Sequence, residues 1–169
     1  MGQVIFNRDL GPVAVYWNSI LIGPTVGGLK LKIEAKTVEV KEDAFGAMPA
    51  DAVFVGLEIP DIEIPIGRFT LAQMETLTKG GTLVGNVMTM ANPVGEAMYA
   101  DSKELQFRPI INGVPSAVTT EYITIFKTYP VTAWEIPYDN ATQRIHKVKF
   151  KVFIKQESPN IYDVYKCGE

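Results

Sequence analysis

Strict alternation of apolar and charged residues is the feature that most limits what this chain can fold into. In the stretch LKLKIEAK, residues 29–36, apolar residues alternate with Lys or Glu at every second position. Residues 144–156 repeat the pattern, with Val148 and Phe150 between lysines and Val152 after Lys151. Because successive side chains of a β-strand point to opposite faces, both segments predict strands with one buried and one solvated face.

The alternation changes phase just after the first of these segments. Beyond Lys36 and Thr37, the apolar positions become Val38 and Val40. Since a strand cannot exchange its two faces without an extra residue, we expect a β-bulge or a bend near Lys36 and Thr37. Residues 52–59 are nearly all apolar, which predicts a strand buried on both faces.

Prolines and a capping motif mark the next two elements. Residues 62–66 alternate between isoleucine and Glu or Pro, close to Pro60, which predicts a strand at a sheet edge or corner. Thr70 followed by Gln73 matches a capping box, in which each side chain satisfies a free backbone group at the start of a helix. The apolar spacing that follows predicts a helix over residues 71–79, closed by a pair of glycines.

The rest of the chain is expected to consist mainly of strands. Residues 82–104 have poor periodicity and predict a long loop with at most a short strand in it. Strands are predicted over residues 104–111 and 119–129, with a hairpin turn at Asn112-Gly113. The fold class is therefore mainly β: a single domain over residues 1–169, built as an antiparallel β-sandwich or barrel with one short flanking α-helix and a long loop.

The overall charge argues against a nucleic-acid-binding protein. With 16 basic and 19 acidic side chains the formal charge is -3, so no net field attracts a polyanion. The lysines of residues 144–156 are accordingly interpreted as solvated, or as paired with carboxylates of a neighbouring subunit. The apolar stretch 10–29 is broken by prolines and glycines, so it predicts no membrane span, and we expect a protein used in soluble form.

Residue types that carry catalysis or bind metals are scarce. The single histidine, His146, lies at the start of a lysine-rich strand, and the single cysteine, Cys167, lies near the end of the sequence. We therefore predict no catalytic residues, no metal site and no cofactor. The clustered acids Glu58, Asp61 and Glu63 are interpreted as surface carboxylates rather than as a calcium site.

Several segments follow one another in a distinctive order. They are GPVAVYWNSILIG, VGGLKLKIEAKTVEVKEDAFGAMPADAVFVGLEIPDIEIPI, FTLAQMETL and ATQRIHKVKFKVF. They combine a Gly-Gly pair before an alternating strand, a Phe45-Gly46 turn, an apolar strand through Val55-Gly56, the short helix and a closing strand. In this order, over about half of the chain, they resemble the tail tube proteins, or major tail proteins, of long-tailed bacteriophages.

This resemblance implies a structural protein of the virion rather than an enzyme. It implies subunits that assemble in the host cytoplasm into hexameric rings, which stack into a hollow tail tube. DNA would pass through this tube from capsid to cell without specific binding. The implied partners are further copies of the chain and other tail proteins, with the helix and long loops packed between neighbouring subunits.

The residues themselves are compatible with such an assembly. Many alternating strands leave sheet edges that must be paired or protected, and closure of a ring would pair them. Carboxylates that line a bore would repel phosphates, so that DNA slides rather than sticks. Because Glu58, Asp61 and Glu63 lie close together in the sequence, we hypothesise that they face the bore.

Three alternatives remain at this point. A neck, terminator or distal tail protein would share the fold but form a single ring. A small-ligand-binding β-barrel would use Trp17, Trp134 and the tyrosines to line a cavity, although aromatic residues more often pack in a core. An enzyme would need a mechanism based on carboxylates that converge in a cleft.

Overall fold

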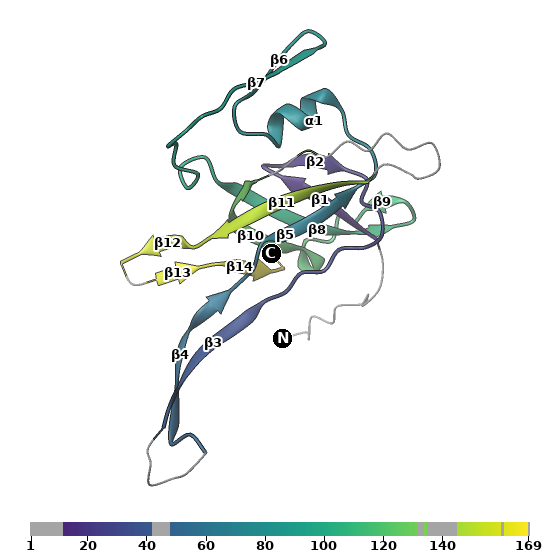
Figure 1. The fold of residues 1–169 in the computed structure, drawn as a ribbon. Helices are drawn as coiled ribbons and strands as arrows, with labels where there is room; N and C mark the ends of the chain where they lie inside the picture. The colour runs from purple at the N-terminus through teal and green to yellow at the C-terminus, as the bar shows by residue number, and fades with distance from the viewer. Residues whose placement is uncertain (1–11, 42–47, 132–133, 135–144, 160, 169) are drawn as a thin grey trace. The chain divides into compact units, whose positions relative to one another are not determined.

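The computed structural model describes residues 12–41, 48–131, 134, 145–159 and 161–168 (Figure 1). The chain divides into two compact units, residues 1–30 with 61–169 and residues 31–60. The larger unit contains β1 (Val13–Trp17), β2 (Ile20–Gly23), β5 (Ile62–Ile66), α1 (Leu71–Thr76), β6 (Gly81–Val84), β7 (Val87–Met90), β8 (Lys103–Ile111), β9 (Val114–Pro115), the 3-10 helix η2 (Thr119–Glu121), β10 (Ile123–Pro130), β11 (His146–Phe153), β12 (Lys155–Ser158), β13 (Ile161–Asp163) and β14 (Tyr165–Cys167). The smaller unit contains β3 (Glu34–Val40) and β4 (Asp51–Glu58).

The main sheet of the larger unit is antiparallel and curled. Its strand order is β2-β1-β8-β10-β11-β5, with β14 also paired to β10 and β9 to β8. The chain just after β2 reaches β5 at the other end of this order: the Val26 N–H donates to the Pro65 carbonyl at 3.0 Å, and Thr25 forms a β-bridge with Ile66. The predicted class, a mainly β fold with a sandwich-like or barrel-like antiparallel sheet and a short helix, is confirmed.

Period-2 alternation builds the core of this unit as predicted. In β11, Val148 and Phe150 are fully buried, and the lysines between and beside them are exposed. In β5 the isoleucines are buried and the strand lies at one end of the sheet order, as its prolines led us to expect. Other strands of the sheet add further large core residues, among them Val15, Trp17, Leu105, Phe107 and Ile125.

The hairpin predicted at Asn112-Gly113 is confirmed. These residues have φ values of 51° and 80° and connect β8 to the two-residue strand β9. Asparagine and glycine tolerate this left-handed backbone, which matches the twist of the flanking strands. The strand expected over residues 119–129 begins later, at Ile123, because residues 119–121 form the 3-10 helix η2 instead.

The capping box is confirmed, although the helix is shorter than predicted. The Thr70 N–H donates to Gln73 Oε1 at 2.8 Å, and the Gln73 N–H donates to Thr70 Oγ1 at 3.2 Å. The helix ends at Thr76 rather than at residue 79, and a turn follows in which the Gly81 N–H donates to the Thr78 carbonyl at 3.1 Å. The Gln73 side chain also donates to the Leu21 carbonyl at 3.0 Å, so α1 satisfies an acceptor on β2.

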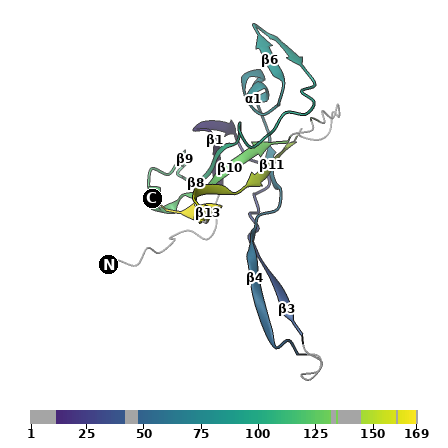
Figure 2. The same ribbon diagram turned by 90° about the vertical axis from the view of Figure 1, so that its left-hand side faces the viewer.

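Residues 82–104 are more regular than predicted. β6 and β7 form a hairpin around Gly85-Asn86, and β6 lies beside α1 (Figures 1 and 2). The connection from β7 to β8 is held to the end of the helical region by Lys79, which pairs with Glu96 at 2.8 Å and also with Asp101.

The smaller unit corrects two predictions. β3 begins at Glu34 rather than at residue 29, because its only partner among the described residues, β4, ends at Glu58 opposite Glu34. The apolar strand over residues 52–59 exists as β4, but the prediction that it is buried on both faces is wrong. Every residue of β4 is exposed or half-buried, because this two-stranded sheet has no second layer of its own to cover it.

Candidate self-association surface

The β3–β4 hairpin places each side chain on one of two faces through its register. Residues directly opposite each other on antiparallel strands share a face. The first face carries the opposed pairs Glu34–Glu58, Lys36–Gly56, Val38–Val53 and Val40–Asp51. The second face carries the opposed pairs Ala35–Leu57, Thr37–Phe54 and Glu39–Ala52.

A register shift lies between Lys36 and Thr37, where a bulge or bend was predicted. The extra residue, however, lies on the partner strand: Lys36 pairs with Gly56 and Thr37 with Phe54, which leaves Val55 unpaired. β3 therefore alternates without interruption, and its apolar residues move from the second face to the first. As a result of the shift, Val53 shares the first face with Val38, and Phe54 lies on the second face.

These apolar side chains are uncovered. Val38 is 59% exposed and Val53 56% on the first face, and Phe54 is 59% exposed on the second. Large contiguous apolar patches on a soluble protein mark sites of association. The sequence analysis did not identify these residues as exposed. An apolar run has the same sequence pattern whether its own chain or a partner covers it.

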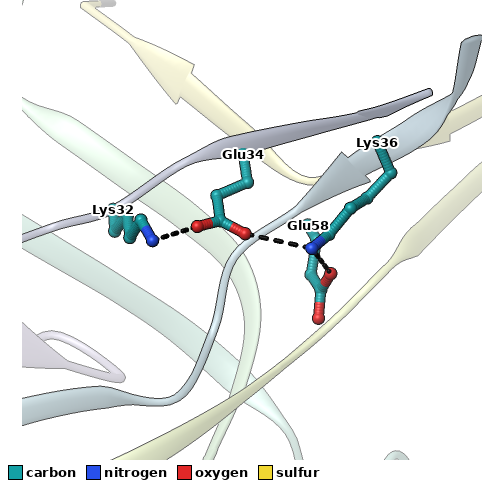
Figure 3. A network of polar contacts seen from close by, with 4 residues as sticks. All are labelled: Lys32, Glu34, Lys36 and Glu58. Carbon is teal, nitrogen blue, oxygen red and sulfur yellow. Dashed lines mark hydrogen bonds and ion pairs between the residues drawn. The ribbon is translucent and has the colours of Figure 1, made fainter.

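The end of the hairpin opposite its loop carries an ion-pair network on the first face (Figure 3). Glu34 pairs with Lys32 and, at 3.1 Å, with Lys36, whose Nζ atom also lies 3.1 Å from Glu58 Oε2. The hydrogen bond from Lys32, followed by that from Lys36, lowers the pKa of Glu34 below its ordinary value. The hydrogen bonds to Glu34 and Glu58 raise the pKa of Lys36.

The backbone of the hairpin has unused hydrogen-bonding capacity. Among the described residues no third strand pairs with β3 or β4, so the outer edge of each strand is open. An isolated two-stranded hairpin is at best marginally stable in water, and open edges are templates for pairing with another chain. The main sheet differs, because its end strands meet through residues 24–26. The expectation that strand edges are paired by neighbouring copies stays a prediction.

The three acids proposed to face a bore fall into two groups. Glu58 belongs to the smaller unit and pairs with Lys36. Asp61 and Glu63 belong to the larger unit, where they line a shallow open depression together with Lys147. Glu63 pairs with Lys149 at 2.9 Å, and this hydrogen bond lowers its pKa. Their orientation toward a bore stays a prediction.

The aromatic residues suggested for a ligand cavity pack against other residues. Trp17 lies in an edge-to-face arrangement with Tyr129, with ring centroids 6.4 Å apart. The cavity beside Trp17 has a volume of about 10 Å³, which holds about one water molecule. The indole N–H of Trp134 donates to Thr78 Oγ1 at 2.6 Å.

The histidine and the cysteine lie where the sequence indicated. His146 is the first residue of β11, is buried, and packs edge-on against Phe69 with ring centroids 4.5 Å apart. Its Nδ1 atom has no hydrogen-bond partner among the described groups. Cys167 is exposed and free.

Within the described part of the chain, no cluster of three or more His, Cys, Asp or Glu side chains is placed to hold a metal ion. None of the helices described here is long and apolar enough to cross a membrane.

The β6–β7 hairpin is a second surface that the sequence analysis described only as a possible short strand. Val84 and Val87 flank its turn and are exposed. Gly-Asn between two short apolar runs is a recognised signal for a two-residue hairpin turn, and it identifies this element. No protein-family model and no curated protein matches the chain.

Proposed function

We propose that this chain is the repeated structural subunit of a phage tail tube, which assembles with further copies of itself into stacked, hexameric rings around a conduit for DNA. The proposal rests on the sequence resemblance and on one structural observation. That observation is the β3–β4 hairpin, which exposes apolar side chains on both faces and leaves both of its outer strand edges unpaired.

The hairpin supports an assembling protein for an energetic reason. Apolar surface removed from water contributes about 25 cal/mol per Å². Residues such as Val38, Val53 and Phe54 obtain little of this contribution in the exposed hairpin. A partner that covers these side chains would remove their apolar surface from water and so stabilise both the complex and the hairpin. Association and ordering of the hairpin would therefore be coupled.

The larger unit supports the same proposal because it needs no partner to cover its core. Its core is filled by its own side chains, and its curled sheet is closed by residues 24–26. It is therefore a stable body that can carry association elements without needing a partner for its own folding. In this proposal the protein has no catalytic role, and its product is the assembled tube.

The cavity beside Trp17 argues against the small-ligand-binding alternative. Ligand sites typically have volumes of about 300–1,000 Å³, whereas this cavity has room for about one water molecule. The aromatic residues named for that alternative instead make ring contacts and a hydrogen bond within the chain.

Electron microscopy of the purified protein over a range of concentrations tests the proposal. We expect hollow filaments or six-fold rings that appear as the concentration rises, and a mass that increases in parallel in light scattering. Single rings that never stack would favour a neck, terminator or distal tail protein. A protein that stays monomeric at high concentration would overturn the proposal.

A further inference from the structure

One face of the main sheet carries polar side chains that the proposed function does not use. The strand registers place Tyr16 of β1, Gln106 of β8 and Thr124 of β10 directly opposite one another. Arg108 lies on the same face, because side chains two positions apart in a strand point the same way. The other face of these strands holds core residues, among them Val15, Leu105 and Ile125.

Arg108 is half-buried, and three contacts hold its guanidinium group. The Cζ atom lies over the ring of Tyr16, 4.2 Å from its centre, and over the ring of Tyr122, at 4.8 Å. The Nε–H group donates to Gln106 Oε1 at 2.6 Å. The Gln106 amide is oriented in turn, because its Nε2 atom lies 3.2 Å from Thr124 Oγ1. The charged group is therefore positioned before any ligand binds.

This guanidinium group has unused hydrogen-bond donors. An arginine side chain has five N–H donors in one plane and no acceptor. Gln106 takes the Nε–H group, and no acceptor for the N–H groups of the two Nη atoms is found in the described part of the chain. The contacts with the tyrosine rings use none of these donors.

Two acids lie close to Arg108 along the chain or across the sheet, but neither pairs with it. Glu104 shares its face of β8 but lies four residues away, which is about 13 Å along a strand. Glu121 comes just before Tyr122, and its carboxylate accepts a hydrogen bond from Ser116 Oγ at 3.2 Å. A half-buried cation without a counter-ion loses hydration and gains no ion pair in return, so an added anion would stabilise it.

We propose that Arg108 is a binding site for a carboxylate, which accepts two parallel hydrogen bonds from the two Nη atoms. Gln106 occupies the Nε edge of the guanidinium group, so the Nη end is the edge that a bidentate ligand can use. A planar donor group held in one orientation suits a planar acceptor such as a carboxylate. The neighbouring tyrosine rings replace water around the cation, which strengthens its hydrogen bonds to an anion.

The carboxylate can come from a small free acid or from an Asp or Glu side chain of another copy. The site is the same in both cases, so this inference does not depend on the proposed function.

NMR of the arginine side chains in the monomer tests the site. Sodium acetate replaces sodium chloride at constant pH and ionic strength, which keeps the screening of charges constant. We expect the Nε–H and Nη–H signals of Arg108 to shift in a saturable manner, with an apparent affinity at least about tenfold higher than at Arg68. Arg68 is exposed and serves as the control. Small, non-saturating shifts that are equal at the two arginines would overturn the site.

Variants identify the groups that hold the acetate, with the backbone N–H signals of residues 106–108 as the readout. Arg108→Lys keeps the charge but lacks the planar fork, so the saturable response should be lost. Gln106→Leu removes the acceptor that orients the guanidinium group, so the affinity should fall. Arg68→Lys should respond like the wild type. An unchanged response in folded Arg108→Lys would attribute the effect to charge alone and overturn the site, and the wild-type titration decides by itself if this variant does not fold.

Inorganic phosphate is the rival ligand. Lys166 lies on the same face, opposite Thr124, and a phosphate group carries more negative charge than a carboxylate. In a carboxylate site, we expect acetate and phosphate at equal ionic strength to bind Arg108 with affinities that differ by less than about tenfold. Phosphate that binds more tightly than this would overturn the assignment of the ligand as a carboxylate.

Assembly distinguishes the two sources of the carboxylate. If another copy supplies it, acetate in place of chloride should raise the critical concentration of the wild type, and Arg108→Lys should assemble less readily and without sensitivity to acetate. If a small free acid is the ligand, acetate should affect the two proteins equally. A wild type that forms no assembly would contradict the proposed function, whereas the acetate titration of the monomer would still decide whether Arg108 is the site.

Discussion

Lys149 of β11 lies directly opposite Glu63 of β5, and its Nζ atom lies 2.9 Å from the Oε1 atom of that glutamate. Lys147 approaches the same carboxylate at 3.8 Å. Part of the lysine row of β11 thus meets a carboxylate of its own chain, whereas we had expected it to be solvated or paired with a neighbouring subunit. The hydrogen bond from Lys149 lowers the pKa of Glu63, and the same bond raises the pKa of Lys149.

Reversal of this charge should destabilise the larger unit. Glu63→Lys places a third ammonium group beside Lys147 and Lys149, so we expect a lower midpoint of thermal unfolding. Asp61→Lys, on the same exposed stretch, should have a smaller effect, because Asp61 attracts Lys149 only weakly and has no direct ion pair among the described residues. The difference should shrink in high salt, which screens exposed charges. Equal losses for the two variants would contradict this view of the pair.

The hypothesis that Glu58, Asp61 and Glu63 face a bore predicts weak interaction between DNA and the assembled tube. We expect wild-type tubes to retain no short duplex DNA in co-sedimentation, and tubes of the triple lysine variant to retain it in a salt-dependent manner. The matched control reverses Glu96, Glu104 and Glu121, three exposed or half-buried acids elsewhere in the larger unit. Retention that is the same for the triple variant and the control would count against a bore lined by these three acids.

Two phenylalanines should separate folding from assembly. Phe150 is 0% exposed, so Phe150→Ala should cost about 3–5 kcal/mol of the free energy of unfolding. Phe54 is 59% exposed, so Phe54→Ala should change the stability of the monomer by less than about 0.5 kcal/mol while weakening assembly. Chemical denaturation of the monomer and light scattering of concentrated protein measure the two effects. A large loss of monomer stability in Phe54→Ala would show that its side chain is covered within its own chain.

The helix cap can be tested with two threonines of one helical segment. Thr70→Ala removes the side chain that accepts a hydrogen bond from the Gln73 N–H, and it should cost about 1 kcal/mol. Thr76 donates to the Ala72 carbonyl inside the helix, so Thr76→Ala should leave stability nearly unchanged, since alanine favours the helix. Denaturant unfolding compares the two variants. The cap has no special role if both variants behave alike.

The ion-pair network of the β3–β4 hairpin predicts a defined pH dependence. The lowered pKa of Glu34 means that its contribution to hairpin stability is present above the ordinary value near 4.5 and is lost as the pH falls through the lower folded value. Lys32→Met removes the largest cause of this shift, so the titration midpoint of Glu34 should rise. Lys41→Met, which pairs with Glu39 instead, should leave it unchanged. Carboxyl NMR shifts of the monomer report both midpoints, and an unmoved midpoint in Lys32→Met would refute the assignment.

Local patterns predicted several elements because they depend only on neighbouring residues. The Thr70–Gln73 capping box and the Asn112-Gly113 turn act through backbone groups a few positions away. The buried face of β11 follows from the alternation of side chains along an extended backbone. Predictions of this kind need no knowledge of which strands become neighbours.

The apolar run over residues 52–59 shows where such prediction stops. Its residues were expected in a core, yet β4 pairs only with β3 among the described residues, and its side chains are exposed. Apolar composition indicates that a segment will be buried, but it does not indicate whether its own chain or another chain buries it. The candidate site could therefore be recognised only after the strand pairings were known.

The sequence by itself determined which side chains share a face of each strand, where the chain turns, and how the short helix begins. Only the tertiary structure decided that residues 24–26 reach β5, that Glu63 meets Lys149, and that the β3–β4 hairpin has no covering layer of its own. The physical reason is that side-chain direction repeats with a short local period, whereas burial depends on segments far apart in the chain that pack together.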